Sequence, residues 1–179
     1  MSTSPWRYVK VAIVATTLAG PVSAAAQTNP ETPRPSQLNR DSAAIMTTIA
    51  DESAAFWNKD FDKWASYWIH APYVRVMGWW ARGGVTVREG WDTVGGEVKR
   101  LMQENPQPNP TATRLRRENI NLQVRGNTAW VTFDEYGLAT GDSLMDMAGL
   151  SRETRVLEKR AGKWRIAYSG WLLHGATKP

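Results

Sequence analysis

The chain has 179 residues, a length that suits one domain with a proper core and leaves no room for two ordinary domains. It has no cysteine, so disulfides and thiolate metal sites are excluded and packing alone must hold the domain together, with ten tryptophans to supply that packing. The formal net charge of +5 is a mild excess of scattered basic residues without a binding motif, which argues against a nucleic-acid partner.

The N-terminus has the order of a secretory signal. Arg7 and Lys10 come first without any acidic residue, the short apolar run VAIVATTLAGPVSA follows, and small residues end the segment. This order predicts a signal peptide over residues 1–26, cleaved after Ala24 or Ala26. The mature protein is then expected in the periplasm or the medium, with no membrane attachment after cleavage.

A linker and two helices are expected next. Residues 27–35, QTNPETPRP, hold three prolines and have the composition of a linker, so the folded domain is expected over residues 36–175. Apolar residues recur at helical spacing over residues 36–58. Asp60 can cap a second, short helix, which must end before Pro72 because the residue that precedes a proline avoids the helical region.

The rest of the chain predicts a hairpin, a third helix and a meander of strands. Residues 73–80 and 85–88 have strand propensity on either side of a glycine turn, and a helix is expected from Gly90 to the prolines of PQPNP. Beyond PQPNP the apolar period changes from helical spacing to two. Helices first and strands last predict an α+β domain in which a curved, mostly antiparallel sheet wraps around three helices. The four late strands are expected near residues 112–124, 129–139, 152–159 and 163–173.

Several phrases in this order resemble one family. They are DFDKWASYWIHAPYVRVMGWWARGGVTVREGWD, AWVTFDEY and RETRVLEKRAGKWRIAY. The chain resembles the nuclear transport factor 2-like superfamily over residues 36–174, and within it the SnoaL-like bacterial proteins related to ketosteroid isomerase. The resemblance implies a cone-shaped fold with three N-terminal helices in the concave face of the sheet, an apolar pocket between them, and often a homodimer formed through the sheet. Its members include isomerases, dehydratases, cyclases and proteins without catalysis, so the fold alone assigns no reaction.

The chain departs from ketosteroid isomerase at that enzyme's catalytic positions. Aligned on WIHAPYVRV, the general-base aspartate corresponds to Val76, which cannot take a proton, and the tyrosine of the first helix corresponds to Glu52. His70 stands where many relatives carry an acidic residue at the mouth of the fold. The resemblance therefore does not carry the steroid isomerase mechanism to this chain.

His70, Asp134 and Tyr136 are the candidates for proton transfer. An imidazole titrates near neutral pH, although His70 could instead close the second helix as a cap. On the strand AWVTFDEY, Trp130, Asp134 and Tyr136 share one face and Glu135 lies on the other. If the first set faces the pocket, Asp134 or Tyr136 is the partner of His70. If the face with Glu135 points into the pocket, Asp134 and Tyr136 are surface or interface residues. A period of two leaves both readings open.

Other residues combine apolar surface with a polar group, as small-molecule pockets do. Arg75 shares a strand face with Met77 and Trp79, while Tyr67 and Tyr168 each carry a hydroxyl. The alternative for the aromatic residues is core packing, and for Arg75 an outward orientation into water. The candidate ligand-binding residues are Tyr67, Arg75, Met77, Trp79, Trp130 and Tyr168.

These observations lead to two functional hypotheses. The first is an exported, homodimeric domain that binds a small apolar or aromatic molecule in its cone and acts as a cofactor-free lyase, dehydratase or isomerase. The alternative is a ligand-binding or interaction module without catalysis. No metal site is expected, because two distant histidines without cysteine do not supply three or four converging ligands.

Overall fold

The computed structural model describes residues 35–80, 84–109, 115–137 and 149–173. The predicted signal peptide lies outside the described residues, as does the predicted linker apart from its last residue, Pro35. None of the described helices is long and apolar enough to cross a membrane.

Three helices form where the apolar periodicity predicts them. The first places Ile45 and Ile49, both without exposed surface, against the rest of the core. Asp60 caps the second helix as expected, because its carboxylate accepts a hydrogen bond of 3.0 Å from the backbone N–H of Lys63. The helices are α1 (Pro35–Trp57), α2 (Phe61–Ser66) and α3 (Trp91–Glu104).

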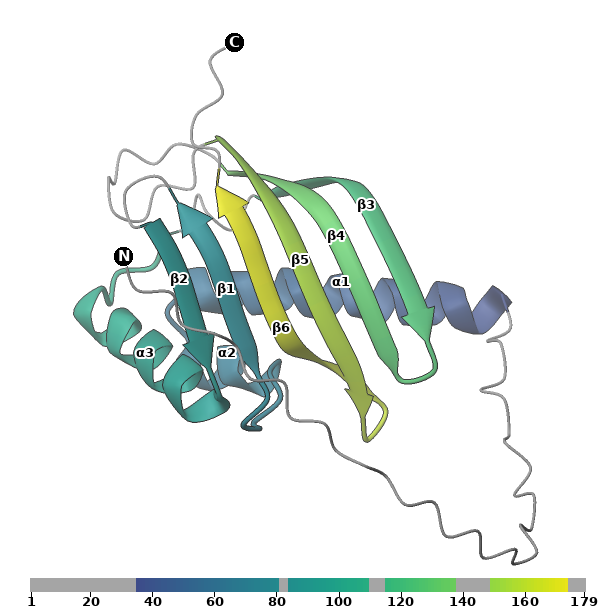
Figure 1. Cartoon of the computed structure of the whole chain (residues 1–179), viewed down its shortest axis with the longest axis horizontal. Helices are drawn as coiled ribbons and strands as arrows, with labels where there is room; N and C mark the ends of the chain where they lie inside the picture. The colour runs from purple at the N-terminus through teal and green to yellow at the C-terminus, as the bar shows by residue number, and fades with distance from the viewer. Residues whose placement is uncertain (1–34, 81–83, 110–114, 138–148, 174–179) are drawn as a thin grey trace, which may run out of the picture.

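The strands form one six-stranded sheet in the order β2-β1-β6-β5-β4-β3. Every neighbouring pair is antiparallel except β1 and β6, which pair in parallel although they lie far apart in the sequence. Figure 1 shows β1 lying beside β6 in the middle of the sheet. The strands are β1 (Arg75–Trp80), β2 (Gly84–Glu89), β3 (Arg116–Arg125), β4 (Thr128–Gly137), β5 (Gly149–Arg160) and β6 (Lys163–Leu173).

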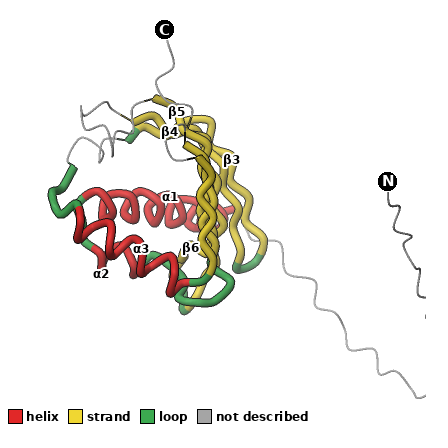
Figure 2. Tube along the Cα trace, turned by 60° about the vertical axis from the view of Figure 1, so that its left-hand side comes forward, coloured by secondary structure: helices red, strands yellow, loops and turns green. Residues whose placement is uncertain are grey.

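All three helices cover one face of the curved sheet, as Figure 2 shows. The predicted α+β architecture is confirmed: the helices pack in the concave face of a mostly antiparallel sheet. The core lies between these two layers, where Trp64 of α2 and Trp68 after it meet apolar side chains of the sheet. Burial of this apolar surface is the main stabilising contribution in a domain without disulfides.

The facing of β4, which the alternation in the sequence leaves open, is now determined. Val131, Phe133 and Glu135 point toward the helices and are 0%, 2% and 4% exposed. Trp130, on the opposite face, is 44% exposed. The set that contains Glu135 therefore faces the interior of the cone, and Asp134 belongs to the outer face.

Candidate functional site

Asp134 and Tyr136 lie on the outer face of the sheet. The carboxylate of Asp134 accepts a hydrogen bond of 2.7 Å from the amide of Asn119 and pairs with Arg152. The guanidinium of Arg116 lies 4.6 Å from the ring centroid of Tyr136. These contacts join neighbouring strands across the outer face of the sheet, where the side chains around Asp134 leave it only 7% exposed. Both residues therefore lie on the face opposite the cone.

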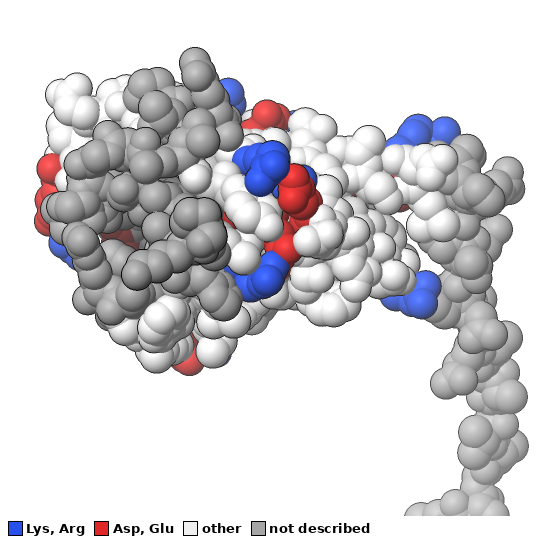
Figure 3. Space-filling model, turned by 90° about the horizontal axis from the view of Figure 1, so that it is seen from above, with Lys and Arg blue, Asp and Glu red and all other residues white. Residues whose placement is uncertain are grey.

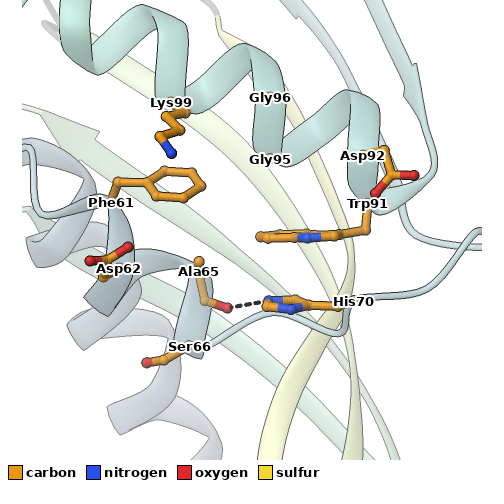
Figure 4. Close-up of a pocket in the computed structure, with 10 residues that line it drawn as sticks. All are labelled: Phe61, Asp62, Ala65, Ser66, His70, Trp91, Asp92, Gly95, Gly96 and Lys99. Carbon is orange, nitrogen blue, oxygen red and sulfur yellow. Dashed lines mark hydrogen bonds between the residues drawn. The ribbon is translucent and has the colours of Figure 1, made fainter.

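His70 follows α2 and contacts that helix. Its Nε2 forms a hydrogen bond of 2.9 Å with the carbonyl of Ala65, so the ring takes up a carbonyl near the helix end. The ring also stacks on the indole of Trp91, with centroids 3.9 Å apart and planes 10° apart (Figure 4). The bond to Ala65 matches the capping alternative for His70, and the stacking joins it to α3 on the helix side of the sheet, whereas Asp134 and Tyr136 lie on the outer face.

His70 borders a groove between α2 and α3 of about 540 Å³. Phe61 and Trp91 line it from opposite sides, and the ammonium of Lys99 lies 5.4 Å from the Phe61 ring centroid (Figure 4). A second hollow of about 520 Å³ shares His70 and extends past Tyr73 to Arg160 and Arg165. The groove is lined by Phe61, Asp62, Ala65, Ser66, His70, Trp91, Asp92, Gly95, Gly96 and Lys99.

Most of the predicted ligand-binding residues also lie outside the cone. Met77 and Trp79 are 43% and 42% exposed on the outer face of β1. Arg75 shares that face, and its Nη2 lies 3.5 Å from Oε2 of Glu89. Trp130 and Tyr168 lie on the outer faces of β4 and β6, whereas the Tyr67 hydroxyl is 3.5 Å from the carboxylate of Asp51 on α1.

Among the described residues, five charged side chains that sequence reasoning did not select lie close together in the interior of the cone. Glu52 comes from α1, where it accepts hydrogen bonds from the indole N–H groups of Trp64 and Trp68, at 2.6 and 3.1 Å. The other four line the inner face of β3, β4 and β5, next to α1. We call the set the cone charge cluster, and its members are Glu52, Arg117, Glu135, Glu153 and Arg155.

Two ion pairs hold the sheet side of the cluster. Arg117 Nη2 lies 2.7 Å from Glu135 Oε2, and Arg155 Nη1 lies 2.7 Å from Glu153 Oε2. Ser151, which is opposite Glu135 in the register, donates its hydroxyl to Glu153. Each of these four charged side chains is 13% exposed or less.

The cluster lies toward the end of the sheet at which β4 ends. Glu135 is two residues before the last residue of β4, Gly137. Seen from this end, acidic and basic side chains lie together in one patch, while most of the other described surface in the view is neither (Figure 3).

Comparisons with known proteins agree with this architecture. A sequence model of the SnoaL-like domain matches residues 45–170, which is most of the chain. The chain belongs to the SnoaL-like domain family. No curated protein matches it.

Solved structures resemble this SnoaL-like domain in fold. A proposed dehydratase of the nuclear transport factor 2-like family from Streptomyces avermitilis aligns with a TM-score of 0.57 at 18% identity, covering 78% of this chain and 99% of the other. A protein of unknown function of that family from Pseudomonas putida KT2440 aligns with a TM-score of 0.58 at 12% identity, covering 79% of this chain and 98% of the other. One from Shewanella oneidensis MR-1 aligns with a TM-score of 0.54 at 16% identity, covering 74% and 98%. At these identities the likeness confirms the fold alone.

Burial sets the protonation of the carboxyls in this SnoaL-like cone. Removal from water, followed by the nearby negative charge of Glu153, raises the pKa of Glu135 to about 7 against the opposing effect of Arg117 and Arg155. Burial also raises the pKa of Glu52, while Arg155 and the two indole donors oppose that rise. A pKa near 7 suits a group that acts as a general base or acid at neutral pH.

Two guanidinium groups of the cluster have unused donors. The Nε–H groups of Arg117 and Arg155 are buried and have no hydrogen-bond acceptor among the described residues. In the described part of the chain, no group of three or more His, Asp or Glu side chains could bind a metal ion. The cone thus offers a carboxyl that titrates near neutrality beside two directed cationic donors.

The signal for Glu135 was present in the sequence but ambiguous. Strand alternation separates Glu135 from Asp134 without choosing the inner face. Arg155 and Glu153 belong to RETRVLEKR, which contributed only to the family resemblance. Glu52 aligned with a catalytic position of ketosteroid isomerase, and that alignment did point into the cone.

Proposed function

We propose that this SnoaL-like domain is an exported, cofactor-free lyase, dehydratase or isomerase that binds a small, largely apolar molecule in its cone and transfers a proton on it through Glu135. The observation that carries the proposal is the buried carboxyl of Glu135 on the inner face of β4, with its pKa raised to about 7. A carboxyl whose pKa is raised by burial and shifted by specific charged neighbours is a candidate for a functional site.

Glu135 is the proton carrier in this proposal. Its carboxylate removes a proton from a carbon next to a carbonyl of the ligand, which leaves an enolate. The resulting carboxylic acid then returns the proton, either to another carbon in an isomerisation or to a departing hydroxyl in a dehydration. Near pH 7 both forms of Glu135 are populated, so one residue can act as base and then as acid.

The neighbouring cluster residues would orient that carboxyl. Arg117 holds Glu135 Oε2 at 2.7 Å and is itself held by Ser53 Oγ of α1, at 2.9 Å. Glu153 adds negative charge, which keeps the Glu135 proton from being lost at lower pH. In this role Arg117 and Glu153 are positioning residues.

The homodimer is proposed on the outer face of the sheet. Met77, Trp79, Val85, Val87 and Leu172 are each at least 42% exposed, on strands that lie side by side. The register places Met77 opposite Val87 and Trp79 opposite Val85 and Leu172. A contiguous apolar patch of this kind favours an interface between proteins over contact with water.

A second candidate function is ligand binding without catalysis in the groove between α2 and α3. The observation that favours it is that His70 at the edge of the groove already has Nε2 bonded to Ala65 and its ring stacked on Trp91. Such a groove would hold a ligand between Phe61 and Trp91 without proton transfer.

Proton exchange at carbon tests the proposed reaction. Acetophenone incubated with the protein in D2O should exchange its α-methyl protons faster than in buffer, as followed by 1H NMR. Glu135→Gln should abolish this acceleration, whereas Glu118→Gln, on the outer face of β3, should retain it. Equal rates for wild type and Glu135→Gln would reject Glu135 as the proton carrier and leave the binding module as the better account.

A further inference from the structure

The second hollow, of about 520 Å³, lies between the segment that follows α2 and the hairpin that joins β5 to β6. The segment contributes the apolar side chains of Trp68, Ile69 and Ala71, and the hairpin contributes Arg160 and Arg165. We call it the arginine hollow. A concave wall that combines apolar side chains with a few polar groups is typical of sites for small molecules.

Backbone hydrogen bonds fix the segment against β6. The N–H of Ile69 donates to the carbonyl of Ile166 at 2.9 Å, and the N–H of Ile166 donates to the carbonyl of Tyr67 at 2.8 Å. The guanidinium of Arg165, next to Ile166 in the sequence, donates to the carbonyl of Ser66. The wall beside Arg165 is therefore ordered without a ligand, which lowers the entropic cost of binding one.

Arg160 is held in place by Tyr73 and Glu158. Its Nη2 lies 3.2 Å from the Tyr73 hydroxyl and also pairs with the carboxylate of Glu158. The Tyr73 hydroxyl donates to the same carboxylate at 3.2 Å. Both contacts use Nη2, and a guanidinium has five N–H donors on three nitrogens. Arg160 can therefore keep these partners and still donate to a ligand.

Positive charge exceeds negative charge at the hairpin. Glu158 stands opposite Arg165 in the register of β5 and β6, but its carboxylate pairs with Arg160. Arg165 donates to the neutral carbonyl of Ser66, which leaves the charge of the guanidinium unbalanced. Lys163, opposite Arg160 in the register, adds another positive charge. An anion beside Arg165 would therefore be attracted by the net charge of this part of the sheet.

We propose that the arginine hollow binds an oxyanion, the carboxylate or phosphate group of a small organic molecule, through Arg160 and Arg165. A planar guanidinium presents parallel N–H donors, which match two oxygens of a carboxylate or a phosphate. The apolar body of the ligand packs against Tyr73 and the segment 68–71. None of the cone charge cluster lines this hollow, so the site is independent of proton transfer by Glu135.

Probes of matched shape test the need for a negative charge, on the full chain. Benzoate and benzamide share a planar body, but only benzoate is an anion, and phenyl phosphate carries the other oxyanion. Isothermal titration calorimetry at neutral pH should show benzoate binding about tenfold tighter than benzamide, the range for a hydrogen bond between charged groups. If phenyl phosphate binds tighter than benzoate, the ligand class is phosphate esters, and the reverse order assigns carboxylates.

NMR spectroscopy locates the bound probe. In 15N-labelled protein, benzoate should shift the backbone amide signals of Ile69 and Ala71, which line the arginine hollow. The amide signals of Val131 and Phe133, on the inner face of β4, should stay in place. Shifts confined to β4 would mean that benzoate binds in the cone, and they would overturn the proposed site.

Two substitutions with opposite effects test the residues. Arg165→Gln removes the unbalanced charge and should weaken benzoate binding about tenfold. Glu158→Gln removes the carboxylate that competes for Arg160 and should tighten binding about fivefold, a gain that a misfolded variant could not produce. Arg100→Gln, which breaks an exposed ion pair with Glu104 on α3, is the matched control and should leave the affinity unchanged.

Four results would overturn the oxyanion site: no binding of benzoate or phenyl phosphate, equal affinity for benzamide and benzoate, unchanged benzoate affinity in Arg165→Gln, or an equal loss in Arg100→Gln. The proposed function fails separately. Arg165→Gln should keep the proton exchange of acetophenone, and Glu135→Gln should keep the affinity for benzoate. A wild-type protein that binds benzoate but exchanges no protons rejects the reaction and retains the oxyanion site.

Discussion

Arg117 Nη2 lies 2.7 Å from Glu135 Oε2 on the inner face of the sheet, and the same nitrogen donates to Ser53 of α1 at 2.9 Å. One guanidinium thus ties β3, β4 and α1 together at a carboxyl that titrates near neutral pH. This relationship makes Glu135 both part of the interior packing and the group whose charge changes, so its substitution should affect stability and chemistry together.

Glu135 should make the protein less stable as pH rises from about 4.5 to 7. Its pKa is raised from 4.5 to about 7 in the folded state, so in this window the folded state binds more protons than the unfolded state, and stability falls as pH rises. A shift of that size corresponds to about 3 kcal/mol at most. Its contribution becomes constant only well above pH 7, where Glu135 is deprotonated in both states.

Glu135→Gln should remove that dependence. Denaturant unfolding of wild type and Glu135→Gln at pH 5 and pH 8 measures it, with Glu118→Gln as the matched control. The free energy of unfolding of Glu135→Gln minus that of wild type should be about 1–3 kcal/mol larger at pH 8 than at pH 5. A difference that does not change with pH would contradict the raised pKa of Glu135.

Substitution of Glu52 should lower the free energy of unfolding more than substitution of its neighbour Asp51 on α1. Glu52→Ala leaves the indole N–H groups of Trp64 and Trp68 without their acceptor and should lower the free energy of unfolding by about 3 kcal/mol. Glu52→Gln keeps an acceptor oxygen and should lose less. Urea titration checks both, and Asp51→Asn on the same helix serves as the control. Equal losses for Glu52→Ala and Glu52→Gln would reject the role of the two indole bonds.

His70 should contribute to stability and little to proton exchange. His70→Ala removes the ring stacked on Trp91 and the bond to Ala65, so we expect a loss of about 1–2 kcal/mol and an unchanged rate of α-proton exchange on acetophenone. Thermal unfolding and the D2O exchange assay measure the two effects. Loss of exchange at full stability would restore His70 as the proton carrier.

Charge on the outer sheet face should separate the proposed dimer. Trp79→Glu places a carboxylate among exposed apolar side chains of neighbouring strands and should weaken self-association by about 100-fold. Lys99→Glu, on α3 at the helix side, is the control and should have no such effect. Sedimentation equilibrium gives the dissociation constants. A wild-type protein that remains monomeric at every concentration would reject this interface.

The exported form should begin at residue 25 or 27. Residues 1–26 carry the order of a signal peptide, with basic residues, an apolar run and small residues in turn. Expression in a bacterial host, followed by N-terminal sequencing of the periplasmic fraction, measures the cleavage site. Recovery of the intact Met1 form from the periplasm would contradict cleavage.

The sequence by itself determined the elements and the family. Apolar spacing along α1 and the capping Asp60 predicted the first two helices, because helix formation depends on neighbours three and four residues apart. The change to a period of two predicted β3 to β6 in the right places. All of these signals are local, so a single sequence contains them.

Only the tertiary structure decided which residues share the cone. AWVTFDEY has apolar and acidic residues on both faces, so alternation could not choose between Asp134 and Glu135 until α1 packed against one face. The register of β3, β4 and β5 then brings Arg117, Glu135 and Glu153 together with Glu52, from four separate elements. The burial that raises the pKa of Glu135 exists only in that assembly, since desolvation belongs to a packed interior and not to a stretch of sequence.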